Sequence, residues 1–257
     1  MAKVTLIAYT PNPDQVVAQA ARLCYSSASI GEIQNHLTPE KAASMVKMLS
    51  EMGHESPTEH ASFTFGIEGV SRSFLAQITR HRIASYSVKS QRYVNEENFE
   101  FVIPPEIEAI PEAREEFLAA MEDDRKRYEK ISRFLEQHHK QRLMQAGKSE
   151  KEAASAARKL ANEDARFVLP NACTTNMICT FDARSLNHFF TLRCCNRAQW
   201  EIREVAVQML RLARQVAPEL FRQSGPGCVR GACTEGKMTC GRAEEVRKFF
   251  HHLGQEE

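Results

Sequence analysis

The stretch from Pro111 to about Gln145 constrains the fold of this chain more than any other. It is highly charged, and its apolar positions recur at mostly helical spacings: Phe117, Met121, Tyr128, Ile131, Phe134 and Leu135. This pattern predicts one long helix. A second helix is predicted from Ser149 to Phe167, with its end marked by Pro170.

Shorter helical and strand patterns surround this long section. Val4 to Tyr9, Phe63 to Ile67 and Asn176 to Phe181 are typical of strands. Further helices are predicted with Asp14, Thr38, Ser71 and Asp182 as caps, and from Ala198 to about Val216. Because strands and helices are mixed without a regular βαβ alternation, we expect an α+β fold with long helices and a small antiparallel or mixed sheet.

The overall composition indicates a single domain with a short addition. The 257 residues show no internal repeat and no shift in composition, so we expect one domain over residues 1–222 and a Cys-containing C-terminal appendage over residues 223–257. A formal net charge of +1 argues against a nucleic-acid coat. No apolar run approaches the ~18–20 residues that span a bilayer, so no membrane partner is expected.

The eight cysteines are an unusual count for such a chain: Cys24, Cys173, Cys179, Cys194, Cys195, Cys228, Cys233 and Cys240. Disulfide frameworks belong to short secreted chains, whereas this chain has 14 Phe for a core and no signal-peptide pattern at its N-terminus. We therefore expect free thiols in a reducing cytoplasm. The last three cysteines lack C-x2-C spacing, so we assign no metal, although a structural zinc completed by His251 or His252 remains an alternative.

Two segments concentrate basic residues. Residues 80–93 contain Arg80, Arg82, Lys89 and Arg92, together with one His, three Ser and two Tyr, but no acidic residue. Burying so many donors is costly unless an anion completes them. The second segment places Arg184, Arg193, Arg197 and Arg203 among Phe189, Phe190 and Trp200, and Arg166 could join it. The alternative for both segments is an ordinary solvated basic surface.

The first basic segment carries a resemblance to a known family. Arg80-His81-Arg82, seven further residues and then Ser90 match the RHR-x7-S signature of flavin-dependent thymidylate synthases. Three other blocks, residues 54–65, 165–170 and 193–203, resemble the family in the same order and spacing. The sequence is therefore similar to this family from about residue 50 to residue 215.

The resemblance implies a reductive methylation in dTMP biosynthesis. dUMP would receive a methylene from methylenetetrahydrofolate and a reducing equivalent from FAD that NADPH has reduced. Arg193 matches the arginine that the family places against the pyrimidine, where a fixed cation stabilises the anion that develops on the ring. Family members are homotetramers with shared active sites, so Arg193 is expected to serve the nucleotide of a neighbouring subunit.

The resemblance also implies which residues bind each ligand. The positions that match nucleotide-binding ones are Gln77, Ile78, Thr79, Arg80, Val88, Lys89, Ser90, Gln91, Arg92, Arg166 and Arg193. Those that match flavin-contacting positions are Ser56, Glu59, Arg80, His81, Arg82, Val88, Asp182, Arg184 and His188. The sequence departs from the family at Ser87-Val88, where Asn-Glu is common, and at Asp182 and His188, where Asn is common.

Several other interpretations compete with this one. Ser90 could be a nucleophile rather than a phosphate ligand, and Cys194 or Cys195 could attack a substrate rather than pack in the core. The chain could be a flavoprotein that oxidises NADPH without methylating dUMP. It could also be a basic nucleic-acid-binding module with a cysteine-bound zinc, although the net charge of +1 counts against that.

Overall fold

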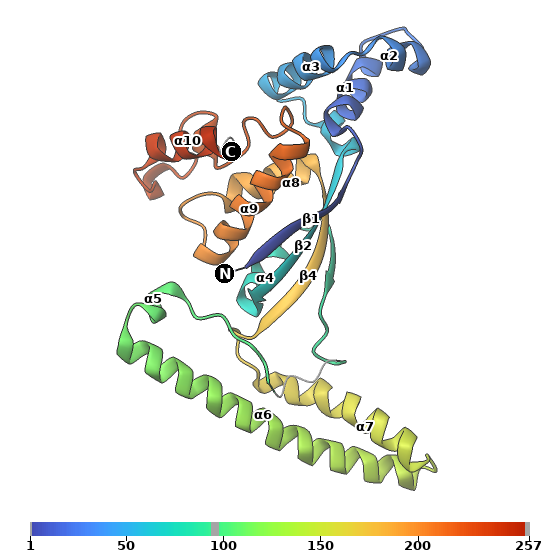
Figure 1. The fold of residues 1–257 in the computed structure, drawn as a ribbon, viewed down its shortest axis with the longest axis vertical. Coiled ribbons are helices and arrows are strands. Elements are labelled where there is room, and N and C mark those ends of the chain that lie inside the picture. The colour runs from blue at the N-terminus through green and yellow to red at the C-terminus, as the bar shows by residue number, and fades with distance from the viewer. Residues whose placement is uncertain (1, 94–97, 255–257) are drawn as a thin grey trace. The chain divides into compact units, whose positions relative to one another are not determined.

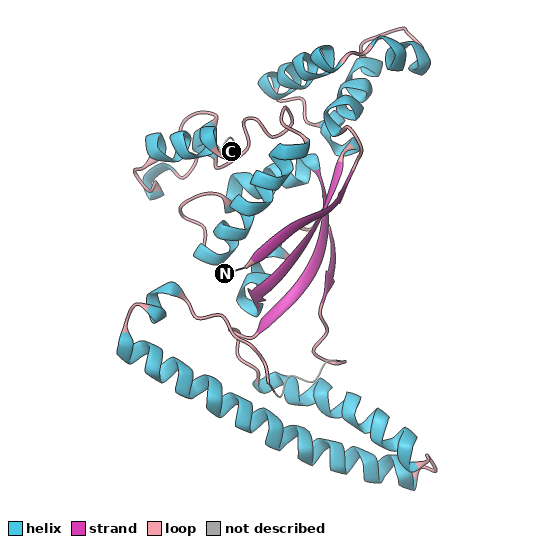
Figure 2. Ribbon diagram, in the orientation of Figure 1, coloured by secondary structure: helices cyan, strands magenta, loops and turns pink. Residues whose placement is uncertain are grey.

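The computed structural model describes residues 2–93 and 98–254, and its elements are shown in Figure 1. A small four-stranded antiparallel sheet has the order β1-β2-β4-β3, and most of the remaining elements are helices, which confirms the α+β class. The strands are β1 (Lys3–Tyr9), β2 (Ser62–Ser71), β3 (Ser85–Val88) and β4 (Thr174–Asp182). In Figure 2 the strands form a twisted ribbon of magenta arrows.

The chain divides into two compact units. The first comprises Met1–Glu68, Gln77–Ser87 and Met177–Glu257, and the second comprises Gly69–Ala76 and Val88–Asn176. Strands β2 and β4 pass from one unit into the other. The predicted boundary near residue 222 is a different division and stays a prediction.

The helical elements of the first unit lie before β2 and after β4 in the chain. They are α1 (Pro13–Cys24), α2 (Ile30–His36), α3 (Pro39–Met52), the 3₁₀ helix Ser56–His60, α8 (Ala183–Arg193), α9 (Trp200–Val216) and α10 (Ala243–His252). Helix α4 (Arg72–Ile78) crosses the division between the units. Helix α9 packs against β1 and α8, and α10 packs against the 3₁₀ turn Gly227–Val229.

The core of the first unit begins with the alternation along β2. Phe63, Phe65 and Ile67 are fully buried because successive side chains of a strand point to opposite faces. The ring of Phe63 meets the edge of Phe221, with centroids 5.1 Å apart, and Phe190 lies 5.8 Å from Phe221. These edge-to-face contacts pack α8 and the turn after α9 onto the sheet.

Two helix caps show where local sequence rules held and where they failed. Thr38 caps α3 as predicted: its hydroxyl accepts a hydrogen bond from the Lys41 amide. The prediction that Asp14 caps α1 is wrong, because Asn12, in a left-handed conformation, is the N-cap. The Asp14 carboxylate instead accepts hydrogen bonds from the amides of Glu219 (3.2 Å) and Leu220 (3.1 Å), more than two hundred residues away.

The second unit contains the helices that the charged section predicted. Helix α6 (Pro111–Gln145) and α7 (Glu150–Ala165) lie side by side as a hairpin (Figure 1), with the short α5 (Pro105–Glu108) before them. Four alanines spaced four residues apart make the buried stripe of α7: Ala153, Ala157, Ala161 and Ala165. The predicted end of α7 is nearly correct, since a 3₁₀ turn, Arg166–Val168, follows directly.

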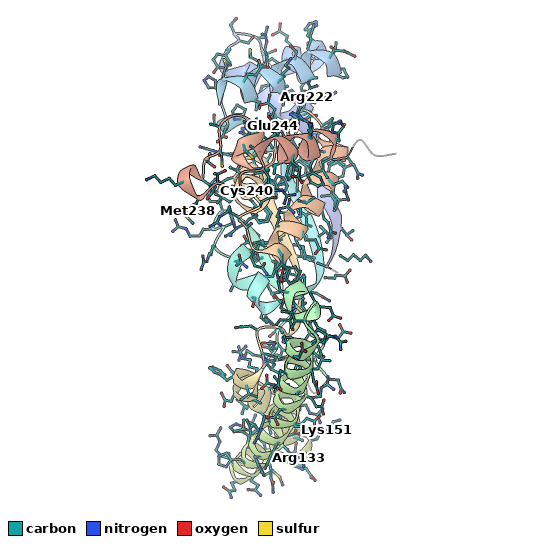
Figure 3. The ribbon with its side chains drawn as sticks, turned by 90° about the vertical axis from the view of Figure 1, so that its left-hand side faces the viewer. Arg133, Lys151, Arg222, Met238, Cys240 and Glu244 are labelled. Atoms are coloured by element: carbon teal, nitrogen blue, oxygen red, sulfur yellow. The ribbon has the colours of Figure 1, made fainter. Side chains whose placement is uncertain are left out.

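The outer surface of the hairpin is mostly charged. Lys140 and Glu150 form an ion pair of 2.7 Å beside the connecting loop, and exposed residues such as Arg133 and Lys151 lie along the helices (Figure 3). Phe134 belongs to the apolar series that predicted the helix, yet 60% of its surface is exposed. The spacing of the apolar residues therefore predicted the helix correctly, but Phe134 itself is not a buried position.

One arginine holds the C-terminal segment. Arg214 of α9 donates hydrogen bonds from all three of its nitrogens to five backbone carbonyls: those of Phe221, Arg222, Ser224, Phe250 and Leu253. Arg247 of α10 donates in turn to the carbonyls of Cys228 and Gly231, each at 2.7 Å. Side-chain donors therefore satisfy backbone that no strand or helix pairs.

All eight cysteines are free thiols, and Cys194 is fully buried. Burial raises the pKa of the Cys194 thiol, so it stays protonated and packs as an apolar side chain. Within residues 2–93 and 98–254 no three His, Cys, Asp or Glu side chains are arranged to hold a metal ion. No helix in the same ranges is both long and apolar enough to cross a membrane.

Candidate functional site

A pocket of about 650 Å³ lies in the first unit, between the loop after α4, the 3₁₀ helix Ser56–His60 and helix α8. Eight residues that the sequence predicted to bind ligands line it: Glu59, Arg80, His81, Arg82, Asp182, Arg184, His188 and Arg193. Segments from three distant parts of the chain therefore meet at one cavity, of a size that suits a small-molecule ligand.

Hydrogen bonds to the end of α4 and from Tyr86 fix the backbone of the loop that carries Arg80, His81 and Arg82. The amide of His81 donates to the carbonyl of Ile78 at 3.1 Å, which continues the end of α4. The hydroxyl of Tyr86 lies 2.9 Å from the carbonyl of Ile78 and 2.8 Å from that of His81, and these two oxygens share its one proton. Burial raises the pKa of the Tyr86 phenol, so the hydroxyl keeps the proton that it donates.

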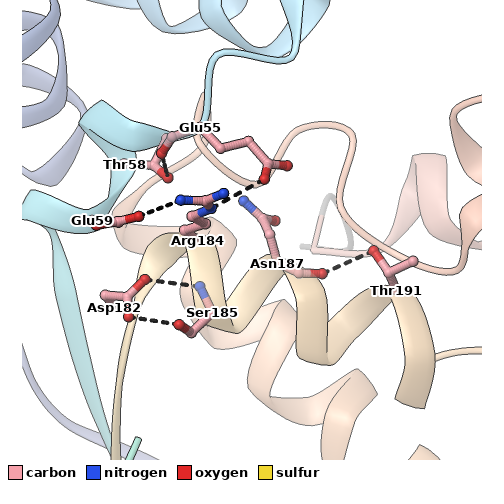
Figure 4. A network of polar contacts seen from close by, with 8 residues as sticks. All are labelled: Glu55, Thr58, Glu59, Asp182, Arg184, Ser185, Asn187 and Thr191. Carbon is pink, nitrogen blue, oxygen red and sulfur yellow. Dashed lines mark hydrogen bonds and ion pairs between the residues drawn. The ribbon is translucent and has the colours of Figure 1, made fainter. Parts of the chain in front are cut away.

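At the first turn of α8 the charged side chains of the pocket form ion pairs or hydrogen bonds with one another and with Ser185 (Figure 4). Asp182 is the N-cap of α8, and its two carboxylate oxygens accept from the Ser185 amide (2.8 Å) and the Ser185 hydroxyl (2.7 Å). Arg184 pairs with Glu59 at 2.5 Å and with Glu55 at 3.4 Å. The hydrogen bond that Arg184 donates to Glu59 raises the pKa of Arg184, so its positive charge is firmly held and is paired with carboxylates.

The last residue of α8, Arg193, has different surroundings. Its Nε donates to Nε2 of His81 at 3.1 Å, and its Nη2 lies 3.5 Å from the carbonyl of Gln77. Among the described residues no carboxylate pairs with it, and three of its five N–H groups have no acceptor there. Burial, and then the charge of Arg80, lowers the pKa of Arg193, although the group remains a cation at neutral pH.

The pocket therefore has an unbalanced positive charge. Arg80 and Arg82 form no ion pair and no side-chain hydrogen bond with any residue in the described ranges. Burial lowers the pKa of His81 to about 4, with further contributions from Arg193 and His188, so its ring is neutral at pH 7. Three arginines without a counter-ion around one cavity are suited to bind an anionic ligand.

The remaining predicted residues lie elsewhere in the fold. In the first unit, Ile78 is buried, Ser56 is exposed on the 3₁₀ helix, and the Gln77 side chain lies 3.4 Å from that of Gln199. Arg203, from the second basic segment, lines a separate hollow with Trp200 rather than this pocket.

The second unit brings part of the predicted nucleotide set together. Arg92 forms an ion pair of 2.9 Å with the Glu163 carboxylate, and Nε of Arg166 donates to the Glu163 carbonyl at 3.1 Å. Ser90 Oγ accepts from the Arg92 amide, and Gln91 contacts the Cys173 thiol. The chain follows β3, which ends at Val88, and the Lys89 amide then donates to the carbonyl of Asn176.

Four lining residues were not predicted to bind a ligand: Glu55, Ile83, Ser185 and Leu192. Glu55 stands in the acidic loop directly before Ser56, and two acids near a cationic segment were a usable signal for the Arg184 ion pair. Ser185 could also have been found, since a serine three residues after a predicted Asp cap is suited to donate back to it.

Comparisons with known proteins identify the family of this chain. Residues 5–219 match the family model described as Thy1, thymidylate synthase complementing protein. The chain is 51% identical to a flavin-dependent thymidylate synthase of Clostridium tetani over 248 residues, which cover 96% of each chain. It is 46% identical to that of Geobacter sulfurreducens, over 98% of this chain and 99% of the relative. A Pyrococcus abyssi relative with the same description is 38% identical, over 93% and 91%. The chain thus belongs to the family of thymidylate synthase complementing proteins.

Proposed function

We propose that this protein is a flavin-dependent thymidylate synthase, which converts dUMP to dTMP with methylenetetrahydrofolate as carbon donor and NADPH as reductant through FAD. The observation that carries the proposal is a pocket of about 650 Å³ lined by Arg80, Arg82 and Arg193, none of which forms an ion pair within the part of the chain that the structure describes. Family membership and the names of the relatives support the reaction.

The residues around the pocket fit a flavin dinucleotide. Its diphosphate needs cations, and Arg80 and Arg82 have no competing carboxylate in the described chain. The proposed contacts are Ser56, Glu59, Arg80, His81, Arg82, Val88, Asp182, Arg184 and His188. Asp182, where Asn is common, is compatible with this because its charge is compensated by two hydrogen bonds at the start of α8. When bound, the flavin supplies the reducing equivalent.

Arg193 is the proposed catalytic residue. Carbon transfer to C5 of the pyrimidine places negative charge on its carbonyl oxygens and N3, and a preorganised cation with spare donors stabilises that charge. The proposed nucleotide contacts are Gln77, Ile78, Thr79, Arg80, Val88, Lys89, Ser90, Gln91, Arg92, Arg166 and Arg193. Ser90 Oγ contacts the Arg92 amide, and within the described chain no histidine hydrogen-bonds to it, which favours phosphate binding over nucleophilic attack.

We further propose a homotetramer with active sites shared between subunits, working in a reducing cytoplasm. The eight free thiols favour such a compartment. Light scattering coupled to size exclusion should give a mass of four chains. A monomer that is fully active would contradict the sharing of sites.

The function is tested in two steps. The purified protein should be yellow and show flavin absorbance, and a colourless protein that takes up no added FAD would exclude the proposal. Release of tritium from C5-labelled dUMP should then require the folate, NADPH and the protein together. Oxidation of NADPH without tritium release would instead identify a flavoprotein that does not methylate dUMP.

A further inference from the structure

We propose that His81 is a positioning residue for Arg193: its neutral ring accepts a hydrogen bond at Nε2 from Arg193 Nε and so fixes the plane of the guanidinium. The proposal deepens the function proposed above and rests on it for the role of Arg193. It gives His81 a second task besides lining the pocket.

The geometry makes His81 the main contact of this guanidinium. The Nε–Nε2 distance is 3.1 Å, whereas the only other hydrogen bond of this guanidinium within the described residues, from Nη2 to the Gln77 carbonyl, is 3.5 Å. Nε is the atom where the rigid guanidinium joins its flexible stem. A bond at Nε restricts the rotation of the whole plane and leaves the terminal nitrogens free for a ligand.

The His81 ring is itself held in place. Phe189 of α8 meets it edge to face, with centroids 5.0 Å apart and an interplanar angle of 77°. Its backbone is fixed by the hydrogen bond from its amide to Ile78 and by the one from Tyr86 to its carbonyl. The buried ring of Phe189 and the half-buried phenol of Tyr86 therefore determine where Nε2 points.

The charges around the ring favour the neutral form that this role needs. Arg193 and His188 face it from α8, and Arg80 and Arg82 precede and follow it in the loop. Of the three acids that line the pocket, Glu55 and Glu59 are paired with Arg184, and Asp182 accepts hydrogen bonds from Ser185. An imidazolium would have to donate at Nε2 and would lose the bond to Arg193. The neutral ring must therefore carry its proton on Nδ1.

Two substitutions distinguish the effect of losing the hydrogen-bond acceptor from the effect of losing the imidazole ring. His81→Gln keeps an acceptor oxygen near the position of Nε2, whereas His81→Leu fills similar space without one. We expect His81→Leu to weaken dUMP binding and reduce turnover, by about 10²-fold if the guanidinium loses its orientation, and His81→Gln to recover most of this loss. His36→Leu, at an exposed position on α2, is the matched control and should leave both quantities unchanged.

A double-mutant cycle distinguishes positioning from a direct flavin contact. In the Arg193→Ala background, His81→Leu should cause no further loss of dUMP affinity, because the residue through which it acts is gone. Flavin content, measured by absorbance, should be unchanged in Arg193→Ala, and any loss that His81→Leu causes through its flavin contact should be equal in the two backgrounds. An undiminished effect of His81→Leu in that background, or an equal loss in His81→Gln and His81→Leu, overturns the proposal.

A spectroscopic test does not depend on turnover. Long-range ¹⁵N–¹H correlations on the flavin-loaded wild type should show His81, assigned by the signal missing in His81→Gln, as the Nδ1–H tautomer with no titration between pH 6 and 7.5. Arg193→Ala should shift its Nε2 resonance. A His81 ring that is protonated at Nε2 at pH 7 contradicts the inference. Should the wild type make no dTMP, the proposed function fails while this measurement still decides the contact.

Discussion

Arg193 and Arg214 are two partly buried arginines in the same unit, and they use their donors in opposite ways. Burial lowers the pKa of both. Arg214 directs its nitrogens at five backbone carbonyls, which matches the five N–H groups of a guanidinium. Arg193 has one good acceptor and one distant one within the described chain.

The difference distinguishes Arg214, which stabilises the fold, from Arg193, which has donors available for a ligand. An arginine whose donors are all satisfied gains nothing from an added anion, whereas spare donors in a cavity have to be satisfied by water or substrate. Arg184 is an intermediate case, since its charge is balanced by Glu55 and Glu59 although it lines the same pocket as Arg193.

The largest expected effect is on activity. Arg193→Ala should lower tritium release from dUMP by ~10²–10³-fold, since removal of one preorganised donor for a developing anion has that size of effect. Flavin content and Tm should stay close to those of the wild type. Arg133→Ala, on the exposed surface of α6, is the control with unchanged turnover. Turnover that persists in Arg193→Ala shows that its role has been assigned wrongly.

The second prediction concerns stability. Arg214→Met should lower the free energy of unfolding by about 3 kcal/mol or more, because five carbonyls lose a charged donor and each such bond contributes ~0.5–1.5 kcal/mol or more. Thermal denaturation should show a Tm lower by roughly 6–12 °C.

Limited proteolysis shows which segment becomes less stable in Arg214→Met. Cleavage of Arg214→Met should begin between residues 223 and 254, the segment that the arginine holds. Arg214→Lys should recover only part of the stability, since an ammonium has three donors. An Arg214→Met protein as stable as the wild type would show that water replaces the five bonds at no cost.

The third prediction concerns the removal of both carboxylate partners of Arg184. Glu55→Gln combined with Glu59→Gln leaves Arg184 without a carboxylate. Because these ion pairs are half exposed, Tm should change by no more than ~2 °C in plain buffer. Added phosphate should raise the Tm of the double variant more than that of the wild type. Equal responses to phosphate would mean that charge balance does not distinguish Arg184 from Arg193.

The smallest expected effect is a pH dependence of the stability that Asp14 contributes through its contact with the turn after α9. Burial raises the pKa of Asp14 above 3.8, although hydrogen bonds from Glu219 and Leu220 oppose this. The folded chain therefore binds more protons than the unfolded chain between 3.8 and the raised value. The contribution of Asp14 to stability must then fall as pH rises through that interval.

Urea denaturation of the wild type and Asp14→Asn between about pH 3.5 and 6 measures this contribution as a difference. The stability of the wild type relative to the variant should decrease with rising pH and become constant above the interval. A difference that increases with pH would mean that the two amides at Glu219 and Leu220 outweigh burial, and that the carboxylate stabilises this turn as an anion.

Sequence patterns predicted the elements well wherever the signal was local. The long helix begins at Pro111 and ends at Gln145 as its periodicity indicated, and Ser71 and Asp182 cap their helices. Asp14 was assigned wrongly because its partners are amides of a distant turn, and backbone amides have no sequence signature.

The site was predictable to a similar extent. The RHR motif, Glu59 and the segment from Asp182 to Arg193 contain the eight predicted residues that line the pocket, but the sequence alone does not reveal which arginine is balanced by a carboxylate and which is not. The role of Arg214 was missed for the same physical reason, since it stands in an ordinary amphipathic helix and binds only carbonyls.

The division of the chain into units also sets an order of assembly. The α6–α7 hairpin uses contacts between neighbours in sequence, so it can form as soon as residue 165 has left the ribosome. The His81–Arg193 contact joins residues that are 112 positions apart in sequence, and the hydrogen bond from Arg214 to the Leu253 carbonyl needs almost the entire chain. From these sequence separations we expect the pocket to be completed after the α6–α7 hairpin, and the turn that Arg214 holds to form last.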